Sequence, residues 1–165
     1  MKYQAIPNFL EEKDFLKIKK VLTGQDFPWM YRPTCSYENK KDGCCFTHCF
    51  YNEGEPKSSF NKDLSVLYEK LKLVGLQQSR ANLMLKDDDN KEGYFHCDFP
   101  FKENMFTAIY YITSNDGYTL LGNESREKQF CEENKIVIFP VDLLHTHVRQ
   151  TNNSQRIVIN INYFV

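Results

Sequence analysis

Residues 94–99 read YFHCDF, and they place a histidine and an aspartate two positions apart within an aromatic run. If this segment is a strand, its side-chain period of two puts His96 and Asp98 on one face and Cys97 on the other. An imidazole nitrogen beside a carboxylate oxygen supplies half of a metal site. An isolated pair of this kind is more often a polar strand end, so the interpretation depends on residues further along the chain.

Strand-like segments follow one another from Arg80 to the C-terminus. They are rich in β-branched and aromatic residues, are separated by polar turns, and cover residues 80–86, 94–101, 106–113, 117–122, 135–140, 145–151 and 156–165. Two helices are expected before them, at about 8–22 and about 61–74. Helices followed by a run of short strands predict an α+β domain built on a two-sheet β sandwich or jelly roll.

The length and charge of the chain limit its organisation and partners. We expect residues 1–165 to form a single domain, with helical support at about 8–75 and the jelly-roll strands at about 80–165. The 21 basic and 22 acidic side chains form no block of like charge. This argues against a nucleic-acid partner, which would be bound through its phosphates by clustered basic side chains. No apolar run approaches a membrane span, and the N-terminus is too acidic for a secretory signal. These features predict a cytoplasmic protein without a membrane partner.

Most of the cysteines gather in one short stretch of the chain. Cys35, Cys44, Cys45 and Cys49 lie close to His48 in sequence. Their spacing is too loose for a typical zinc site, although Cys45 and Cys49 have a suitable separation. We therefore favour buried thiols over a second metal site, and both interpretations remain open at the level of sequence.

The last segment, RIVININYF at 156–164, separates two kinds of side chain by alternation. Three isoleucines and Tyr163 share one face, which predicts hydrophobic packing, while Arg156 shares the other face with Val158 and the two asparagines. A guanidinium that points into the interior of the domain is costly unless it meets an anion. The sequence thus predicts a negatively charged partner for Arg156.

His145 completes a set of two histidines and one carboxylate with His96 and Asp98. This donor set is the facial triad of non-haem Fe(II) oxygenases, in which three protein ligands leave three coordination positions open. His147 is two positions further on and faces the same way, so it is an alternative to His145. The residues alone leave the choice between the two histidines open.

These motifs together resemble the 2-oxoglutarate- and Fe(II)-dependent dioxygenase superfamily. The resemblance rests on HCDF, on FP-x4-H, on H-x10-R and on the N-x-N-Y strand, and it is strongest to small prolyl-hydroxylase-like members, including compact ones carried by bacteriophages. It implies a double-stranded β-helix (jelly roll) with the N-terminal helices packed on one sheet. A phage-encoded protein would act in the host cytoplasm.

The resemblance also implies roles for individual residues. His96, Asp98 and His145 would be the catalytic iron ligands. Arg156 and Tyr111 would bind the distal carboxylate of 2-oxoglutarate, and Asn82 would contact this cosubstrate near the metal. The family activity is hydroxylation of a substrate coupled to oxidative decarboxylation of 2-oxoglutarate to succinate and CO2, with ascorbate as an optional further cofactor.

The substrate class stays open at this level. Nucleic-acid demethylases of this superfamily carry a second arginine on the last strand, whereas this chain has Val158, Asn160 and Asn162 at the corresponding inward positions. The departure favours a peptide, prolyl or small-molecule substrate. The alternative is a non-catalytic metal- or ligand-binding jelly-roll (cupin-like) module. The sequence does not determine the oligomeric state.

Overall fold

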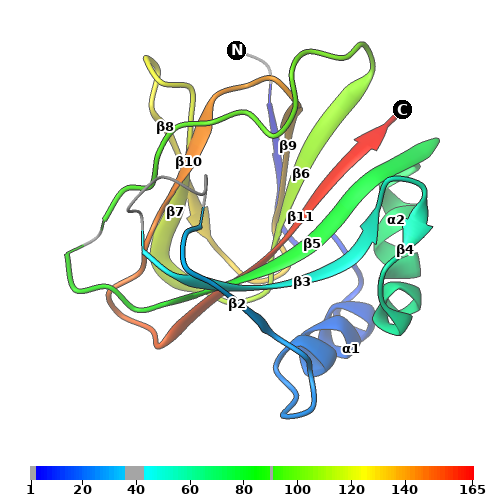
Figure 1. Cartoon of the computed structure of the whole chain (residues 1–165), viewed down its shortest axis with the longest axis horizontal. Coiled ribbons are helices and arrows are strands. Elements are labelled where there is room, and N and C mark those ends of the chain that lie inside the picture. The colour runs from blue at the N-terminus through cyan, green and yellow to red at the C-terminus, as the bar shows by residue number, and fades with distance from the viewer. Residues whose placement is uncertain (1–2, 36–42, 90) are drawn as a thin grey trace.

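Two antiparallel sheets face each other in the computed structural model of the chain, which describes residues 3–35, 43–89 and 91–165 (Figure 1). The large sheet contains, in spatial order, β1 (Gln4–Ile6), β9 (Ile136–Pro140), β6 (Met105–Tyr111), β11 (Gln155–Phe164), β5 (Gly75–Leu85), β3 (Cys45–Asn52) and β2 (Met30–Arg32), and β4 (Glu55–Pro56) pairs with β3. The small sheet contains β10 (His145–Val148), β7 (Asn115–Leu121) and β8 (Glu127–Cys131).

The long strand β11 lies at the centre of the large sheet and separates two cores. Its residues Ile157, Ile159 and Ile161 are at most 1% exposed and pack against the helices, as the alternation predicted. Val158 belongs to a second cluster between the sheets, together with Tyr111 and buried residues of β7, β8 and β9. Helices and small sheet therefore cover opposite faces of the large sheet.

The helices are shorter than the sequence predicted. Helix α1 spans Glu12–Leu22, the 3-10 helix η1 spans Ser59–Leu64, and α2 spans Ser65–Leu71. Helix α1 does not start near Asn8, because Asn8 has a positive φ of 49° and lies in the turn before the helix. Lys72 adopts the left-handed conformation that ends α2, so the second helical segment stops before residue 74.

The strands also depart from the prediction in two respects. The first 56 residues are not mainly helical support, since β1, β2, β3 and β4 come from them, and β8 was missed altogether. The segment 94–101 is not a strand: His96 makes only an isolated bridge with His145. Pro100 has no N–H with which to continue a ladder, which fits the bend found at this point.

Candidate metal centre

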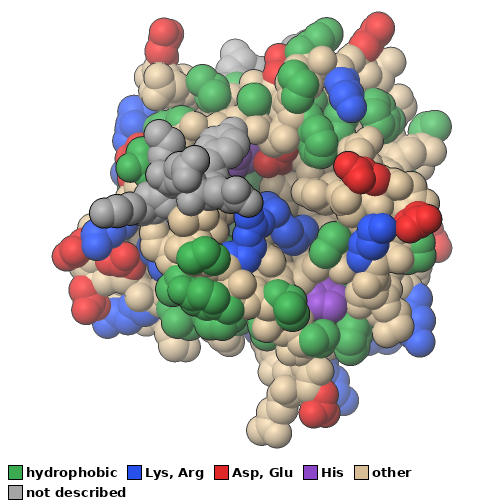
Figure 2. Space-filling model, viewed as in Figure 1, with side chains coloured by type: hydrophobic (Ala, Val, Ile, Leu, Met, Phe, Trp, Pro, Cys, Tyr) green, Lys and Arg blue, Asp and Glu red, His purple; other side chains and the backbone are tan. Residues whose placement is uncertain are grey.

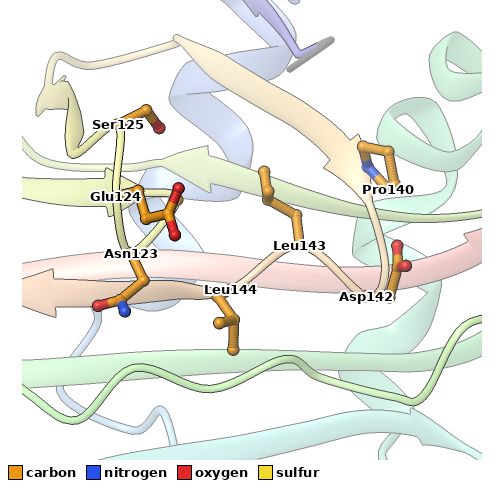
Figure 3. A pocket seen from close by; sticks show the side chains of 8 residues that line it. Asn123, Glu124, Ser125, Pro140, Asp142, Leu143 and Leu144 are labelled. Atoms are coloured by element: carbon orange, nitrogen blue, oxygen red, sulfur yellow. The ribbon is translucent and has the colours of Figure 1, made fainter.

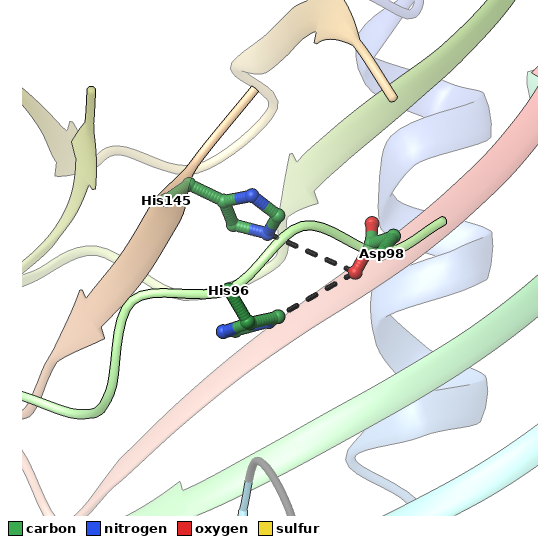
Figure 4. Close-up of side chains that lie close together, drawn as sticks. All are labelled: His96, Asp98 and His145. Carbon is green, nitrogen blue, oxygen red and sulfur yellow. Dashed lines mark ion pairs between the residues drawn. The ribbon is translucent and has the colours of Figure 1, made fainter. Parts of the chain in front are cut away.

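His96, Asp98 and His145 come together between the two sheets. One ligand atom from each lies within 4.8 Å of the others, which makes this the group suited to hold a metal ion among the described residues. Asp98 Oδ1 is 3.9 Å from His96 Nε2 and 3.8 Å from His145 Nε2 (Figure 4). Reciprocal backbone hydrogen bonds of 3.0 and 2.8 Å between His96 and His145 fix the two histidines side by side.

Backbone carbonyls orient both imidazole rings. His96 Nδ1 is 3.0 Å from the carbonyl oxygen of Tyr94, and His145 Nδ1 is 3.0 Å from that of Leu143. A carbonyl oxygen only accepts, so Nδ1 of each ring must carry the proton. In a neutral imidazole the lone pair then resides on Nε2, the atom that faces Asp98. Both rings are thus prepared as neutral metal ligands.

The second oxygen of Asp98 is held by three donors from the large sheet. Thr107 Oγ1 and Asn162 Nδ2 each donate to Oδ2 at 2.8 Å, and Asn160 Nδ2 donates at 3.2 Å. Burial raises the pKa of Asp98, but His145, these hydrogen bonds and His96 outweigh it and hold the pKa below its usual value. The carboxylate is therefore charged at neutral pH, with Oδ1 turned toward the histidines.

The buried environment of His145 also suits a metal ligand. His145 is only 3% exposed, and burial lowers its pKa below the usual value. A neutral imidazole needs no deprotonation before it binds a metal. Two neutral nitrogens and one anionic oxygen on one side of the site fit Fe(II), because this donor set leaves the opposite side open.

Arg156 lies deep between the sheets and is only 2% exposed. Its nitrogens donate to Cys131 Sγ at 3.0 Å, Met84 Sδ at 3.4 Å and Thr119 Oγ1 at 3.2 Å. Burial raises the pKa of the Cys131 thiol, which is therefore neutral at pH 7 and supplies no counter-charge. A buried guanidinium with uncharged partners is costly unless an anion joins it.

One cavity connects the metal-ligand group to Arg156. His96, His145 and Asn160 line it at the metal end and Arg156 at the other end, and its lining also includes Asn82, Met84, Ile109, Thr119, His147 and Val158. Asn160 and Arg156 are four residues apart on β11, so about 13 Å of strand separates the two ends. A short dicarboxylate offers one anionic group to each end, and the side chains that line the cavity cover the rest of the distance.

His145 and not His147 lies in the metal-ligand group. His147 is on the same face of β10 but lines the cavity, and its Nε2 has no hydrogen-bond partner within the described part of the chain. Its pKa lies well below the usual value, first because of burial and then because Arg156 and Arg149 are near. His147 therefore brings a buried ring nitrogen without a partner among the described residues to the cavity that Arg156 also lines.

The two other residues expected to contact the cosubstrate have different positions. Asn82 lines the cavity, and its contact with the cosubstrate remains a prediction. The Tyr111 hydroxyl instead donates to Thr119 Oγ1 at 2.8 Å and approaches the carbonyl oxygen of Gln129 at 3.3 Å. Its contact with a carboxylate remains a prediction. Thr119, which the sequence reading missed, lines the cavity and is detectable only as an inward position of the strand at 117–122.

The cysteine cluster does not complete a second metal site within residues 3–35, 43–89 and 91–165. His48 points to the helical side of the large sheet, where its two ring nitrogens lie 2.9 Å from the Pro28 carbonyl oxygen and 2.8 Å from Ser58 Oγ. Cys45 is 1% exposed, in agreement with a buried thiol. Cys35 contacts Arg149, whose Nη2 is 3.2 Å from the sulfur.

A wider hollow of about 850 Å³ lies away from these groups, between the β7–β8 turn and the β9–β10 connection (Figure 3). Glu124 and Asp142 are its charged side chains, and Leu143 and Leu144 form its apolar part. Its lining contains no histidine, cysteine or basic residue. The cavity at His96 and Arg156, although the smaller of the two, is therefore the one lined by histidine and arginine side chains.

Comparisons with known proteins establish the fold. No family model and no curated protein sequence matches the chain. Among solved structures, a prolyl hydroxylase from Trichoplax adhaerens in complex with a hypoxia-inducible-factor peptide fragment superimposes with a TM-score of 0.70 and 13% identity, covering 98% of this chain and 83% of that one. The viral collagen prolyl hydroxylase of Paramecium bursaria Chlorella virus 1, in complex with 2-oxoglutarate, superimposes with a TM-score of 0.63 at 12% identity. The match covers 100% of this chain and 97% of that one.

A third similar structure is that of an enzyme in complex with a small molecule. The epimerase SnoN, in complex with Fe3+, alpha-ketoglutarate and nogalamycin RO, gives a TM-score of 0.66 at 11% identity, covering 98% of this chain and 78% of that one. The chain thus has the fold of the 2-oxoglutarate- and Fe(II)-dependent oxygenases. No helix of the described residues is long and apolar enough to cross a membrane.

Proposed function

We propose that the chain is an Fe(II)- and 2-oxoglutarate-dependent dioxygenase that hydroxylates a peptide, prolyl or small-molecule substrate. The observation that carries the proposal is Arg156, a buried cation with uncharged partners at the far end of the cavity from the metal-ligand group. A carboxylate of 2-oxoglutarate supplies the missing anion. The proposal takes residues 1–165 as one catalytic domain with a jelly-roll core.

His96, Asp98 and His145 would hold the iron through Nε2, Oδ1 and Nε2. When bound, iron and 2-oxoglutarate supply the oxidising chemistry, in which the cosubstrate becomes succinate and CO2 and a substrate C–H bond is hydroxylated. Thr107 and Asn162 keep Asp98 Oδ1 turned toward the metal by binding the other oxygen. The protein thus provides ligation and orientation.

The far end of the cavity would bind the distal carboxylate of the cosubstrate. Arg156 offers a guanidinium whose fork matches a carboxylate. Thr119 Oγ1 already accepts hydrogen bonds from Tyr111 and Arg156, so its own proton is available to donate to the same carboxylate. Asn82 lies between the two ends, where it would contact the cosubstrate near the metal.

The alternative is a non-catalytic metal- or ligand-binding jelly-roll module. A module that binds only a metal gives no reason for Arg156, whose partners among the described residues are uncharged, and a module that binds an anion differs from the proposed enzyme in having no turnover. The structures with this fold described above include one bound to a peptide and one bound to nogalamycin RO, so the fold accommodates both kinds of ligand.

An anaerobic titration tests the proposal. Fe(II) and then 2-oxoglutarate are added to metal-free protein, and the weak visible charge-transfer band of a chelated 2-oxo acid is followed. We expect the band in the wild type and in His48→Ala, whose histidine lies outside the site, and we expect no band in His96→Ala or His145→Ala. His147→Ala should retain the band with weaker cosubstrate affinity.

The outcomes separate the two functions. Tight Fe(II) binding without a 2-oxoglutarate band would favour the non-catalytic module. A protein that binds no metal would overturn both. Loss of the band in His147→Ala together with its retention in His145→Ala would exchange the roles of these two histidines.

A further inference from the structure

A second arginine faces the interior beside the metal-ligand group. Arg80 lies on β5, in register with Asn160 of β11 and Cys49 of β3. The next residue, Ala81, is fully buried in the core on the helical side, so alternation directs Arg80 to the opposite face, between the sheets. Arg80 therefore occupies the same row of the sheet as Asn160, which contacts Asp98.

Among the described residues, none with a negative charge forms a hydrogen bond or salt bridge with Arg80. Its Nε is buried and has no hydrogen-bond partner, and no salt bridge involves Arg80 in the described part of the chain. Burial lowers its pKa from the usual value, and the nearby guanidinium of Arg32 acts in the same direction, while the charge of Asp98 opposes them. Two guanidiniums close together, one of them with a buried unused donor, form a place for an anion.

Arg80 lines a hollow of about 210 Å³ next to the metal-ligand group. The other lining residues are Cys35, Gln78, His96, Cys97, Asp98 and Phe99. Arg80 also borders the cavity that leads to Arg156, so it stands where the two spaces meet. Figure 2 shows basic side chains gathered at the centre of the face that overlies β2, β3 and β5.

The balance of charge indicates what this hollow accepts. If the proposed function holds, the two positive charges of Fe(II) and the one of Arg156 are balanced by Asp98 and by the two carboxylates of 2-oxoglutarate. Arg80, with Arg32 near it, then remains as an uncompensated cation beside the metal-ligand group. Arg80 is half-buried and its Nε is enclosed, so water solvates its charge only in part, and the remaining ligand of the site, the substrate, is the group that can neutralise it.

We propose that Arg80 binds a carboxylate of the substrate and that the substrate is a small carboxylic acid of about the size of a free amino acid. The hollow is smaller than the range of about 300–1,000 Å³ typical of sites for drug-sized ligands, which favours a compact molecule. Arginine recognises a carboxylate through two parallel N–H···O bonds, which fixes both the position and the orientation of the acid. Arg80 would thereby select acids over amides and esters.

The test reads Arg80 directly by NMR in the full chain without metal. Protein labelled with 15N-arginine is titrated with sodium acetate, and with the neutral isostere acetamide, at constant ionic strength and with 2-oxoglutarate present. We expect the Arg80 Nε–H signal, assigned by its loss in Arg80→Lys, to shift saturably with acetate and not with acetamide. The backbone amide of Cys97 should shift with the same dissociation constant.

Two variants complete the experiment. Arg80→Lys keeps the charge and should retain the acetate-dependent shift of the Cys97 amide with weaker affinity, whereas Arg80→Gln should lose it. An Arg80 signal that does not respond to acetate, or that responds equally to acetamide, would overturn the proposal; the wild-type signal alone decides this, even if Arg80→Gln fails to fold. Because no iron is used, this result is independent of whether the chain forms the Fe(II)–2-oxoglutarate complex.

Discussion

Replacing Arg156 by methionine should affect stability and cosubstrate binding in opposite directions. Methionine has a similar length, carries no charge, and would pack beside Met84 and Cys131, which already contact the guanidinium. Thr119 Oγ1 would still accept a hydrogen bond from Tyr111, so the change leaves no buried oxygen without a partner. The variant therefore removes a buried charge at little cost in hydrogen bonding.

The two expected magnitudes follow from this environment. Replacement of a buried ion pair by well-packed apolar groups is often neutral or stabilising by about 1–4 kcal/mol. The partners of Arg156 are uncharged and offset less of its desolvation, so we expect the metal-free Arg156→Met variant to gain about 1 kcal/mol in free energy of unfolding. Truncating one partner of a buried, hydrogen-bonded charge pair costs about 2–5 kcal/mol in binding. The dissociation constant for 2-oxoglutarate should therefore rise between about 30-fold and several thousand-fold.

Two assays measure these effects. Urea denaturation of the metal-free protein gives the free energy of unfolding, and the anaerobic charge-transfer titration gives the cosubstrate affinity. Metal affinity is the internal control and should be unchanged, because Arg156 lies about 13 Å of strand away from Asn160 at the metal end. A variant that is less stable than the wild type and binds 2-oxoglutarate with unchanged affinity would refute the reasoning.

Two further substitutions test the support around the site. Asn162→Leu removes a 2.8 Å donor from Asp98 Oδ2 and should weaken metal binding by about 10- to 100-fold, measured by competition with a chelator; unchanged affinity would show that this hydrogen bond does not orient the carboxylate. Asp116 accepts hydrogen bonds from Thr151 and from the backbone N–H of Asn152, and these keep its pKa below the usual value despite a small opposing effect of burial. A depressed folded-state pKa adds stability above the unfolded-state value of about 4 and loses it as pH falls through the folded-state value. Asp116→Asn should thus lower the free energy of unfolding at pH 7, and the difference from wild type should shrink below about pH 4 in urea titrations; a difference independent of pH would contradict this.

The alternation of the last strand was readable from the sequence because it depends only on the period of two. Ile157, Ile159 and Ile161 pack on the helices, and Arg156 points to the other side, as RIVININYF predicted. The ends of the helices were less predictable. Several residues near Asn8 could begin the first helix, and contacts with distant segments decide which one does. The Phe9 N–H, for example, donates to the carbonyl oxygen of Asn134, a residue far away in the sequence.

For the candidate site, too, the sequence determined one part and the tertiary structure the other. The sequence by itself determined the donor types, since histidine, aspartate and arginine carry their chemistry wherever they are placed, and the family resemblance favoured His145 over His147 through its spacing after Phe139-Pro140. Only the tertiary structure decided that Asp98 turns Oδ1 toward the histidines, that Thr119 joins Tyr111 to Arg156, and that the buried Nε of Arg80, beside the metal-ligand group, has no hydrogen-bond partner among the described residues. These features depend on the register between strands far apart in the chain, and register is fixed by the packing of whole sheets, which no local pattern encodes.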